Sequence, residues 1–201
     1  MIKEIKPTVF VVDDDTAVRD SLRMLLKSVG LPVEVFESGQ EFLDADRDDR
    51  PGCLVLDIRM PGMSGLELQV KLNERHSILP IIFITGHGDV PMAVEAMQAG
   101  AVDFIQKPFR DQDLLDRINQ ALEKDAGSRR MLAERNMIRK RLESLTPRER
   151  EVLDLVVAGK ANKVIAGDLN LSQRTVEIHR ARVMEKMEAH SLAHLVRMVL
   201  E

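Results

Sequence analysis

Short apolar runs alternate with segments of helical spacing through the first 123 residues of the chain. The runs lie at Thr8–Val12, Val33–Phe36, Cys53–Leu56, Ile81–Ile84 and Val102–Ile105. Between the first two runs, one helical face carries Val18, Leu22, Leu25, Leu26 and Val29; later segments repeat the spacing with Leu66, Val70 and Leu72, with Val94 and Met97, and with Leu114, Leu115, Ile118 and Leu122. Strands that alternate with helices form a parallel sheet covered on both faces. The pattern therefore predicts a doubly wound α/β domain with a five-stranded parallel sheet over residues 1–123.

The pattern changes between residues 124 and 143, where no run resembles a strand. Apolar residues recur at helical spacing, and Met131, Ile138 and Leu145 follow one another in steps of seven. We expect a helical linker that continues the preceding helix. The seven-residue step fits a short coiled coil, and a solvated helix that packs locally explains the same residues equally well.

Residues 144–201 show only helical signals. Pro147 is expected to open a first helix with Thr146 as its cap, and Gly159 to end it. Three further helices are predicted at Asn162–Leu169, at Gln173–Met187 after Ser172, and at His190–Leu200. Four short helices make a small all-α domain of about the minimum size that buries its own core.

The charges divide at the same place as the patterns. Residues 1–123 carry 13 Lys and Arg against 22 Asp and Glu, whereas residues 124–201 carry 16 against 11. An acidic part joined to a basic part indicates two domains with different partners. The chain has no Trp and no Tyr, which argues against nucleic-acid binding by base stacking. A single cysteine excludes an internal disulfide, and the lack of a long apolar run favours a cytoplasmic protein.

Polar residues follow the ends of four predicted strands. Asp13 and Asp14 follow the first, Asp57 the third, Thr85 the fourth and Lys107 the fifth. Ligands of open parallel sheets bind at the carboxyl ends of the strands, so these side chains are expected to converge. Crowded carboxylates suit a hard divalent cation such as Mg²⁺, which often accompanies a phosphoryl group. An Asp beside a cation, a Lys and a Thr has the groups needed to form an aspartyl phosphate.

The motifs around these residues resemble the receiver domain of bacterial two-component response regulators. The resemblance covers residues 8–123 and rests on V-V-D-D-D at 11–15, L-D-I-R-M-P-G-M-S-G at 56–65, T-G-H-G-D at 85–89 and K-P-F at 107–109. It implies that Asp57 is the phosphoacceptor. It also implies a Mg²⁺ site in which Asp57 is a ligand, Asp14 binds the ion directly, Asp13 binds it through water and Arg59 binds it through its backbone carbonyl.

The same resemblance assigns the remaining pocket residues. Thr85 and Lys107 would bind the phosphoryl oxygens, and the Lys107–Pro108 bond would be cis. Phe104 takes the position of the aromatic residue that turns inward when Thr85 is drawn to the phosphoryl group. From the residues alone, Phe104 is equally well explained as a core residue of a strand.

A haloacid-dehalogenase-like phosphatase is the competing class, because it also uses a nucleophilic Asp after a strand together with Mg²⁺. Such an enzyme needs a second acid two residues later as its general acid, and here that position is Arg59. The sequence therefore favours a protein that is modified at Asp57 over an enzyme that turns over an external substrate.

The third predicted helix of the basic part has two different faces. Val176, Val183 and Met187 lie on one side, which is expected to face the core. The other side carries Arg174, Ile178, Ala181, Arg182 and Glu185, with Glu177 and His179 on its flanks. Small apolar groups beside Arg suit the major groove of DNA, where they meet thymine methyls while Arg binds guanine or phosphate. An ordinary amphipathic helix is the alternative, and Glu185 fits it.

Residues 144–201 resemble the LuxR/NarL-type helix-turn-helix domain, through L-T-P-R-E-R-E-V-L at 145–153 and T-V-E-I-H-R-A-R-V-M at 175–184. With the receiver motifs, the whole chain resembles the FixJ branch of the NarL/FixJ response regulators. Glu177 and Ala181 stand where many members have Lys, which implies a different operator sequence. The expected phosphate contacts are Lys160, Lys163, Thr175, His179 and Arg180, which position a domain without reading bases.

These observations predict a DNA-binding transcriptional regulator that is switched when a sensor histidine kinase phosphorylates Asp57. Residues 144–201 carry a net charge of only +1, so two copies on a pseudo-palindrome are expected to be needed for useful affinity. The expected partners are promoter DNA, RNA polymerase and a second copy of the chain. The alternative is a DNA-binding regulator that ignores phosphorylation and uses its receiver as a dimerisation or scaffold module. His190 and His194 have metal-ligand spacing but lack a nearby third ligand.

Overall fold

The computed structural model describes residues 6–47, 50–86 and 90–200, and it divides the chain into two compact units, Met1–Arg130 and Met131–Glu201. Within these described ranges, no helix is both long enough and apolar enough to cross a membrane.

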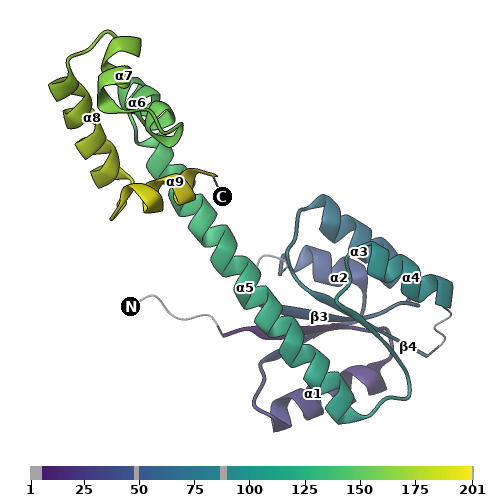
Figure 1. Ribbon diagram of the computed structural model, residues 1–201. Coiled ribbons are helices and arrows are strands. Elements are labelled where there is room, and N and C mark those ends of the chain that lie inside the picture. Colours follow the sequence, from purple (N-terminus) through teal and green to yellow (C-terminus); the bar gives the residue numbers. More distant parts are fainter. Residues whose placement is uncertain (1–5, 48–49, 87–89, 201) are drawn as a thin grey trace. The chain divides into compact units, whose positions relative to one another are not determined.

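The first unit contains the predicted parallel sheet (Figure 1). Its strands are β1 (Thr8–Val12), β2 (Val33–Phe36), β3 (Gly52–Asp57), β4 (Ile81–Thr85) and β5 (Asp103–Gln106), in the order β2-β1-β3-β4-β5. All neighbouring strands pair in parallel, with Asp57 opposite Ile84 and Thr85 opposite Gln106. The predicted fold class is confirmed, and the strand ends differ from the predicted ones by one residue at most.

Helices cover both faces of the sheet, and the alternation of strand side chains decides which core each helix joins. One face packs against α1 (Thr16–Ser28) and the first part of α5 (Asp111–Glu143), through Val9, Val11, Leu22, Leu26, Leu114 and Ile118 among others. The other face packs against α2 (Gly39–Asp44), α3 (Gly65–Glu74) and α4 (Val90–Gln98), through Phe10, Phe42, Leu54, Leu68, Leu72 and Ala96 among others. This two-faced packing holds the strand ends in fixed register.

Three apolar residues of α3 and α4 do not lie where their helical spacing predicts. Val70, Val94 and Met97 are exposed, and the buried position of α4 is Ala96. The inner face of α4 is thus occupied by a small residue, and its larger apolar side chains lie at the surface. Helical spacing therefore identifies these helices but does not place these three side chains in the core.

The helix α5 runs without a break through 33 residues, as the linker prediction anticipates. Its buried carboxylate, on Asp125, accepts the backbone N–H of Gly52 at 3.0 Å and pairs with Arg129 at 2.9 Å. Arg129 in turn donates to the backbone carbonyl of Arg50 at 2.6 Å. These contacts tie α5 to the first unit beyond the predicted end of the α/β domain at residue 123.

The residues that suggested a coiled coil have different surroundings. Ile138, Leu142 and Leu145 are partly buried and pack against the core of the second unit. Met131 is 58% exposed. Ile138 and Leu145 therefore follow the local-packing alternative, and Met131 lies on a stretch of α5 that is exposed on all sides from residue 130 to residue 137.

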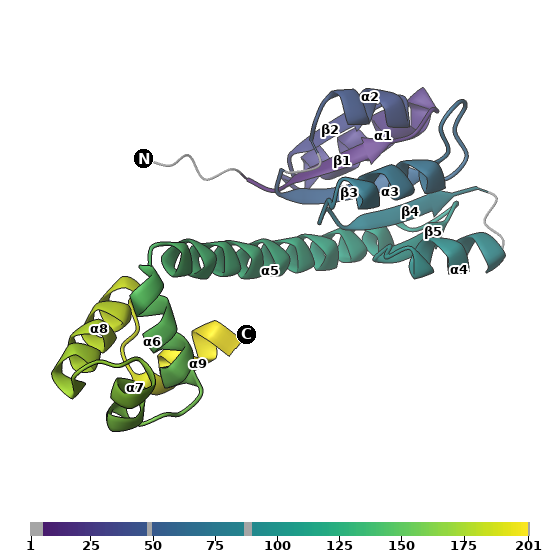
Figure 2. The ribbon, with the colours of Figure 1, turned by 90° about the horizontal axis from the view of Figure 1, so that it is seen from above.

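The second unit is a helical domain formed by α6 (Pro147–Val157), α7 (Asn162–Asp168), α8 (Gln173–Lys186) and α9 (Leu192–Leu200) (Figure 2). Thr146 and Glu149 form a capping box at the start of α6, and Gly159, with a φ of +78°, follows its end. The helix α9 begins two residues later than predicted, because the hydroxyl of Ser191 accepts the backbone N–H of His194 as a cap does. The core contains Val152, Leu153, Val156, Ile165, Val176, Val183, Met187 and Leu195.

Candidate functional site

The carboxyl ends of four strands form a pocket of polar side chains in the first unit. Asp13 follows β1, Asp57 ends β3, Thr85 ends β4 and Lys107 follows β5. Asp13 and Thr85 are each 1% exposed and Asp57 is 6% exposed. Buried polar groups of this kind require partners, and the parallel register brings them to one edge of the sheet.

Lys107 joins the two buried carboxylates. Its Nζ lies 2.7 Å from Asp13 Oδ2 and 2.9 Å from Asp57 Oδ1. The backbone N–H of Lys107 also donates to the backbone carbonyl of Thr85 at 2.8 Å. Two carboxylates that share one ammonium group lie close enough to act on a single ligand, so the structure brings Asp13, Asp57 and Lys107 together as expected.

Backbone and side-chain donors fix the two carboxylates in place. Asp57 Oδ2 accepts the backbone N–H of Arg59 at 2.7 Å, and Asp13 Oδ1 accepts that of Asp15 at 2.9 Å. Arg19 Nη1, on α1, donates to the backbone carbonyl of Asp13 at 2.7 Å. Arg19 was not predicted as part of the site, because its position one turn into α1 after the acidic run is its only signal in the sequence.

A glycine allows α3 to begin directly beside Asp57. A Cβ atom on Gly65 would lie 2.3 Å from the backbone oxygen of Asp57, which is closer than any real side chain allows. The Gly65 N–H donates to the carbonyl of Ile58 at 2.9 Å. Gly65, the last residue of the 56–65 motif, is therefore required by this close approach.

Burial and charge act in opposite directions on the pocket. Burial raises the pKa of Asp57, and the nearby Asp13 adds to the rise, while Lys107 and the Arg59 N–H oppose it; the net pKa is above the usual value. Burial by itself would lower the pKa of Lys107, but its hydrogen bonds and charge interactions with Asp13 and Asp57 leave the pKa raised. Lys107 therefore stays an ammonium group between the carboxylates.

The oxygen ligands in the pocket fit a hard divalent cation. Asp13 and Asp57 offer carboxylate oxygens with unused lone pairs, and Arg59 lies two residues after Asp57. Asp14 is exposed, and within the described ranges no three acidic or His side chains converge on one metal position. Two carboxylates plus carbonyl and water oxygens still match the way Mg²⁺ is bound, because Mg²⁺ keeps several waters.

Phe104 and the Lys107–Pro108 bond belong to β5 and to the segment that follows it. Phe104 lies opposite Phe83 on the neighbouring strand and is partly buried against the core that includes α3 and α4. The Lys107–Pro108 bond is cis, as the resemblance implies. The T-G-H-G-D motif continues through residues 87–89, which lie outside the described residues.

The helix α8 presents the predicted polar face in the second unit. Val176, Val183 and Met187 are buried, as the helical wheel predicts. Arg174, Glu177, Ile178, Ala181, Arg182 and Glu185 are exposed, and the Ile178 side chain is 47% exposed. An apolar residue kept at the surface between Arg residues is consistent with a face that contacts a partner.

The other residues that are expected to contact DNA differ in whether they pair with another side chain. Lys163 is exposed at the start of α7. Lys160 Nζ pairs with Asp168 at 2.7 Å, and the hydroxyl of Thr175 lies 2.8 Å from that of Ser172, the cap of α8. Both pairs are at the surface, where replacing one partner by a phosphate oxygen costs little free energy.

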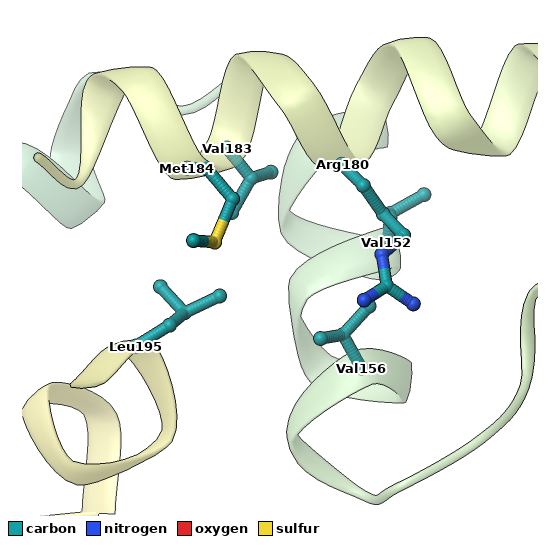
Figure 3. Close-up of a pocket in the computed structure, with 6 residues that line it drawn as sticks. All are labelled: Val152, Val156, Arg180, Val183, Met184 and Leu195. Carbon is teal, nitrogen blue, oxygen red and sulfur yellow. The ribbon is translucent and has the colours of Figure 1, made fainter. Parts of the chain in front are cut away.

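Arg180 is placed differently from the other basic residues. Its side chain extends from α8 toward Val152 and Val156 on α6 (Figure 3), and its Nη1 donates to Asn162 Oδ1 at 2.6 Å. The cavity beside it holds about 10 Å³, room for one water molecule and too little for a ligand. Arg180 therefore joins α8 to the start of α7, a contact that was not predicted from the sequence.

The histidines of the second unit have different surroundings. His179 is partly buried, and its Nδ1 accepts no hydrogen bond from the described part of the chain. His190 and His194 stack with ring centroids 5.4 Å apart, and the backbone N–H of His190 donates to His194 Nδ1. That hydrogen bond occupies one of the nitrogens that a metal would need.

Comparison with known proteins matches a separate family to each part of the chain. Residues 9–119 match the response regulator receiver domain, and residues 143–199 match the bacterial regulatory proteins of the luxR family. Over 193 residues the chain is 53% identical to the transcriptional regulatory protein FixJ of Rhizobium meliloti, covering 96% of this chain and 95% of the relative. It is 50% identical over 193 residues to nodulation protein W of Bradyrhizobium diazoefficiens, covering 96% and 85%.

Solved structures extend the likeness to the fold. The response regulator StyR is 50% identical, with a TM-score of 0.90 over 97% of this chain and 98% of that one. Full-length FixJ from B. japonicum is 47% identical, with a TM-score of 0.60 over 97% and 96%. With both domains matched and nearly its full length aligned, the chain belongs to the FixJ-like transcriptional response regulators, which join a receiver domain to a LuxR-type DNA-binding domain.

Proposed function

We propose that phosphorylation of Asp57 by a sensor histidine kinase switches the DNA binding of this response regulator. The observation that carries the proposal is the buried Asp57 carboxylate, 2.9 Å from Lys107 Nζ and joined through it to Asp13. A carboxylate held in this way is positioned as a nucleophile with cationic stabilisation beside it. The regulator is modified by its partner and does not turn over a separate substrate.

In the transfer, an Asp57 carboxylate oxygen forms a bond to phosphorus while the bond from phosphorus to the kinase histidine nitrogen breaks. The Lys107 ammonium binds a phosphoryl oxygen, and the Thr85 hydroxyl donates to another. Asp13, Asp14 and the Arg59 carbonyl would hold Mg²⁺, which supplies positive charge against the phosphoryl oxygens. The Arg59 N–H continues to hold the Asp57 oxygen that does not react.

A cleft beside the pocket supports the docking of a kinase. It measures about 370 Å³ and is lined by residues of α1 and of the segment after β5, namely Ala17, Val18, Ser21, Leu22, Lys107, Pro108, Phe109 and Asp111. Its apolar lining suits packing against a helix of the kinase. Because Lys107 belongs both to the cleft and to the pocket, a helix bound there would bring its phosphohistidine beside Asp57.

Phosphorylation is proposed to reorganise the surface between Val90 and Gly100 and so to favour a homodimer on a pseudo-palindromic promoter. In α9, Leu195 is buried in the core while Leu192 is exposed and free for a second contact between DNA-binding units. Promoter DNA and RNA polymerase are the proposed partners of the dimer, and both are found in the cytoplasm.

The proposal is tested on the full chain by adding Mg²⁺ with acetyl phosphate or with beryllofluoride, which mimics the phosphoryl group. DNA selected from a random pool supplies the binding site for gel-shift measurements, and sedimentation gives the oligomeric state. We expect tighter DNA binding and dimer formation on addition of either reagent. A wild-type chain that binds DNA equally well without a response is a phosphorylation-independent regulator.

Arg174 and Lys163 are expected to contribute differently to DNA recognition. Arg174→Ala removes a proposed base contact and should weaken selected DNA by about 1–3 kcal/mol while affecting random DNA less. Lys163→Ala removes a proposed phosphate contact, so it should weaken all DNA alike and reduce the salt dependence by about one unit of slope. Gel shifts at several salt concentrations check both, and equal losses on selected and random DNA would remove Arg174 from the readers.

A further inference from the structure

Two side-chain amides of α3 bond the C-terminal end of α4. Gln69 Nε2 donates to the backbone carbonyl of Ala96 at 3.0 Å, and Asn73 Nδ2 donates to that of Ala99 at 2.9 Å. Residues four positions apart lie on the same face of a helix, so both amides belong to one face of α3. This face meets α4 where that helix ends.

The same face of α3 begins against the phosphoacceptor residue. Gly65 precedes Gln69 by four positions and lies so close to the Asp57 backbone that no Cβ atom fits between them. One rigid helix of ten residues therefore contacts the Asp57 backbone at its start and the end of α4 at its other end. The helix α3 therefore connects the phosphoacceptor residue to the end of α4.

Several apolar side chains of α4 lie at the surface, although Met92 packs against the core. Ala96 is its buried residue, while Val90, Val94 and Met97 are exposed. The Ala96 carbonyl does not depend on α3 alone, because the backbone N–H of Ala101 also donates to it at 3.0 Å. The amides of α3 therefore add a contact between helices to an end that is already capped.

Gln69 makes this contact weak in spite of its burial. The residue is 1% exposed, yet its Oε1 accepts no hydrogen bond from any residue that the structure describes. An unpaired buried acceptor loses more than one ordinary hydrogen bond returns. Gln69 thus bonds α4 with one end of its amide while the other end is satisfied only if the surroundings change.

The bonds of Gln69 and Asn73 to α4 occur together with a particular set of bonds at Asp57. Both Asp57 carboxylate oxygens accept hydrogen bonds, one from Lys107 and one from the Arg59 N–H. We propose that Gln69 and Asn73 form a releasable contact that sets how readily α4 reorganises when Asp57 is phosphorylated. The inference rests on the proposed phosphorylation switch and names two positioning residues for it.

The two residues are expected to act in opposite directions. Asn73→Ala removes a surface hydrogen bond and leaves nothing buried unpaired, so it should free α4 and lower the beryllofluoride midpoint about two- to fivefold. Gln69→Met keeps a side chain of similar length, removes the unpaired Oε1 and leaves Ala96 bonded to Ala101. It should therefore favour the present position of α4 and raise the midpoint about three- to tenfold.

The experiment titrates the full-length wild type and both variants with beryllofluoride at fixed Mg²⁺ and follows dimer formation by sedimentation. Amide hydrogen exchange of residues 96–101 reports whether the end of α4 loosens in Asn73→Ala and tightens in Gln69→Met. Val70→Ala is the matched control, since Val70 is an exposed residue of the same helix. Thermal unfolding by circular dichroism confirms that each variant is folded.

Opposite shifts of the two midpoints, with Val70→Ala unchanged, support the inference. Unchanged midpoints alongside altered exchange or melting temperature would make the amides merely structural and overturn it, as would a lower midpoint for Gln69→Met. A wild type that does not respond to beryllofluoride overturns the proposed function and this inference with it. A responding wild type with unmoved variants overturns this inference alone.

Discussion

The Asp57→Asn variant is expected to lose the response of DNA binding to acetyl phosphate and beryllofluoride entirely. The amide has no carboxylate oxygen to form an acyl phosphate, although it still accepts the Arg59 N–H that holds Asp57. Switches of this kind typically change affinity about 5- to 150-fold, and the variant should remain at the low end whatever the reagent. Gel shifts and sedimentation on the full chain measure the loss.

An acid outside the pocket provides the control for this variant. Asp44→Asn makes the same chemical change on α2, at an exposed residue that bonds only the side chain of Gln40 among the described contacts. It should respond as the wild type does. If Asp57→Asn still forms dimers and binds DNA more tightly on addition of acetyl phosphate, the phosphoryl group is accepted elsewhere and the pocket has been misassigned.

The pocket could be predicted because its geometry follows from the topology. Every parallel strand ends at the same edge, so the residues after β1, β3, β4 and β5 meet there whatever lies between them. Asp13, Asp57 and Lys107 are indeed in direct contact. The core face of α8 was predictable for a similar reason, since helical spacing alone places Val176 and Val183 together.

Contacts between elements that are distant in sequence could not be predicted in this way. Asp125 bonds Gly52 across 73 residues, and Gln69 bonds Ala96 across 27, and neither has a local pattern that identifies its partner. Arg180 was predicted to contact a DNA phosphate, and its bond to Asn162 was not predicted because that bond depends on how α7 crosses α8. Packing of this kind depends on how the helices are placed relative to one another, and the hydrophobic periodicity of the sequence does not predict that placement.

Replacing Glu149 is expected to destabilise the DNA-binding unit more than replacing any other charged residue of α6. The Glu149 carboxylate is buried, lies 2.6 Å from Lys186 Nζ and accepts the backbone N–H of Thr146 at 2.9 Å. Glu149→Ala removes the capping box and the ion pair together, so the free energy of unfolding should fall by about 2–4 kcal/mol. Glu151→Ala is the control, because its pair with Arg148 is at the surface and contributes about 0–1 kcal/mol.

The stability that the Glu149–Lys186 pair gives should be lost in acid. The bonds from Lys186 and from the Thr146 N–H lower the pKa of Glu149 to about 2, from an ordinary value of 4.5. A carboxyl whose pKa is lower in the folded state adds stability above pH 4.5 and loses it as the pH falls toward 2.

Glu149→Gln keeps the capping geometry without the charge. The stability difference between wild type and Glu149→Gln should therefore be constant near neutral pH and close in acid. Because the chain has no Trp or Tyr, circular dichroism and segment-resolved hydrogen exchange are the suitable measurements. A difference that persists unchanged at pH 2 would show that the Lys186 pair is not the source of the stability.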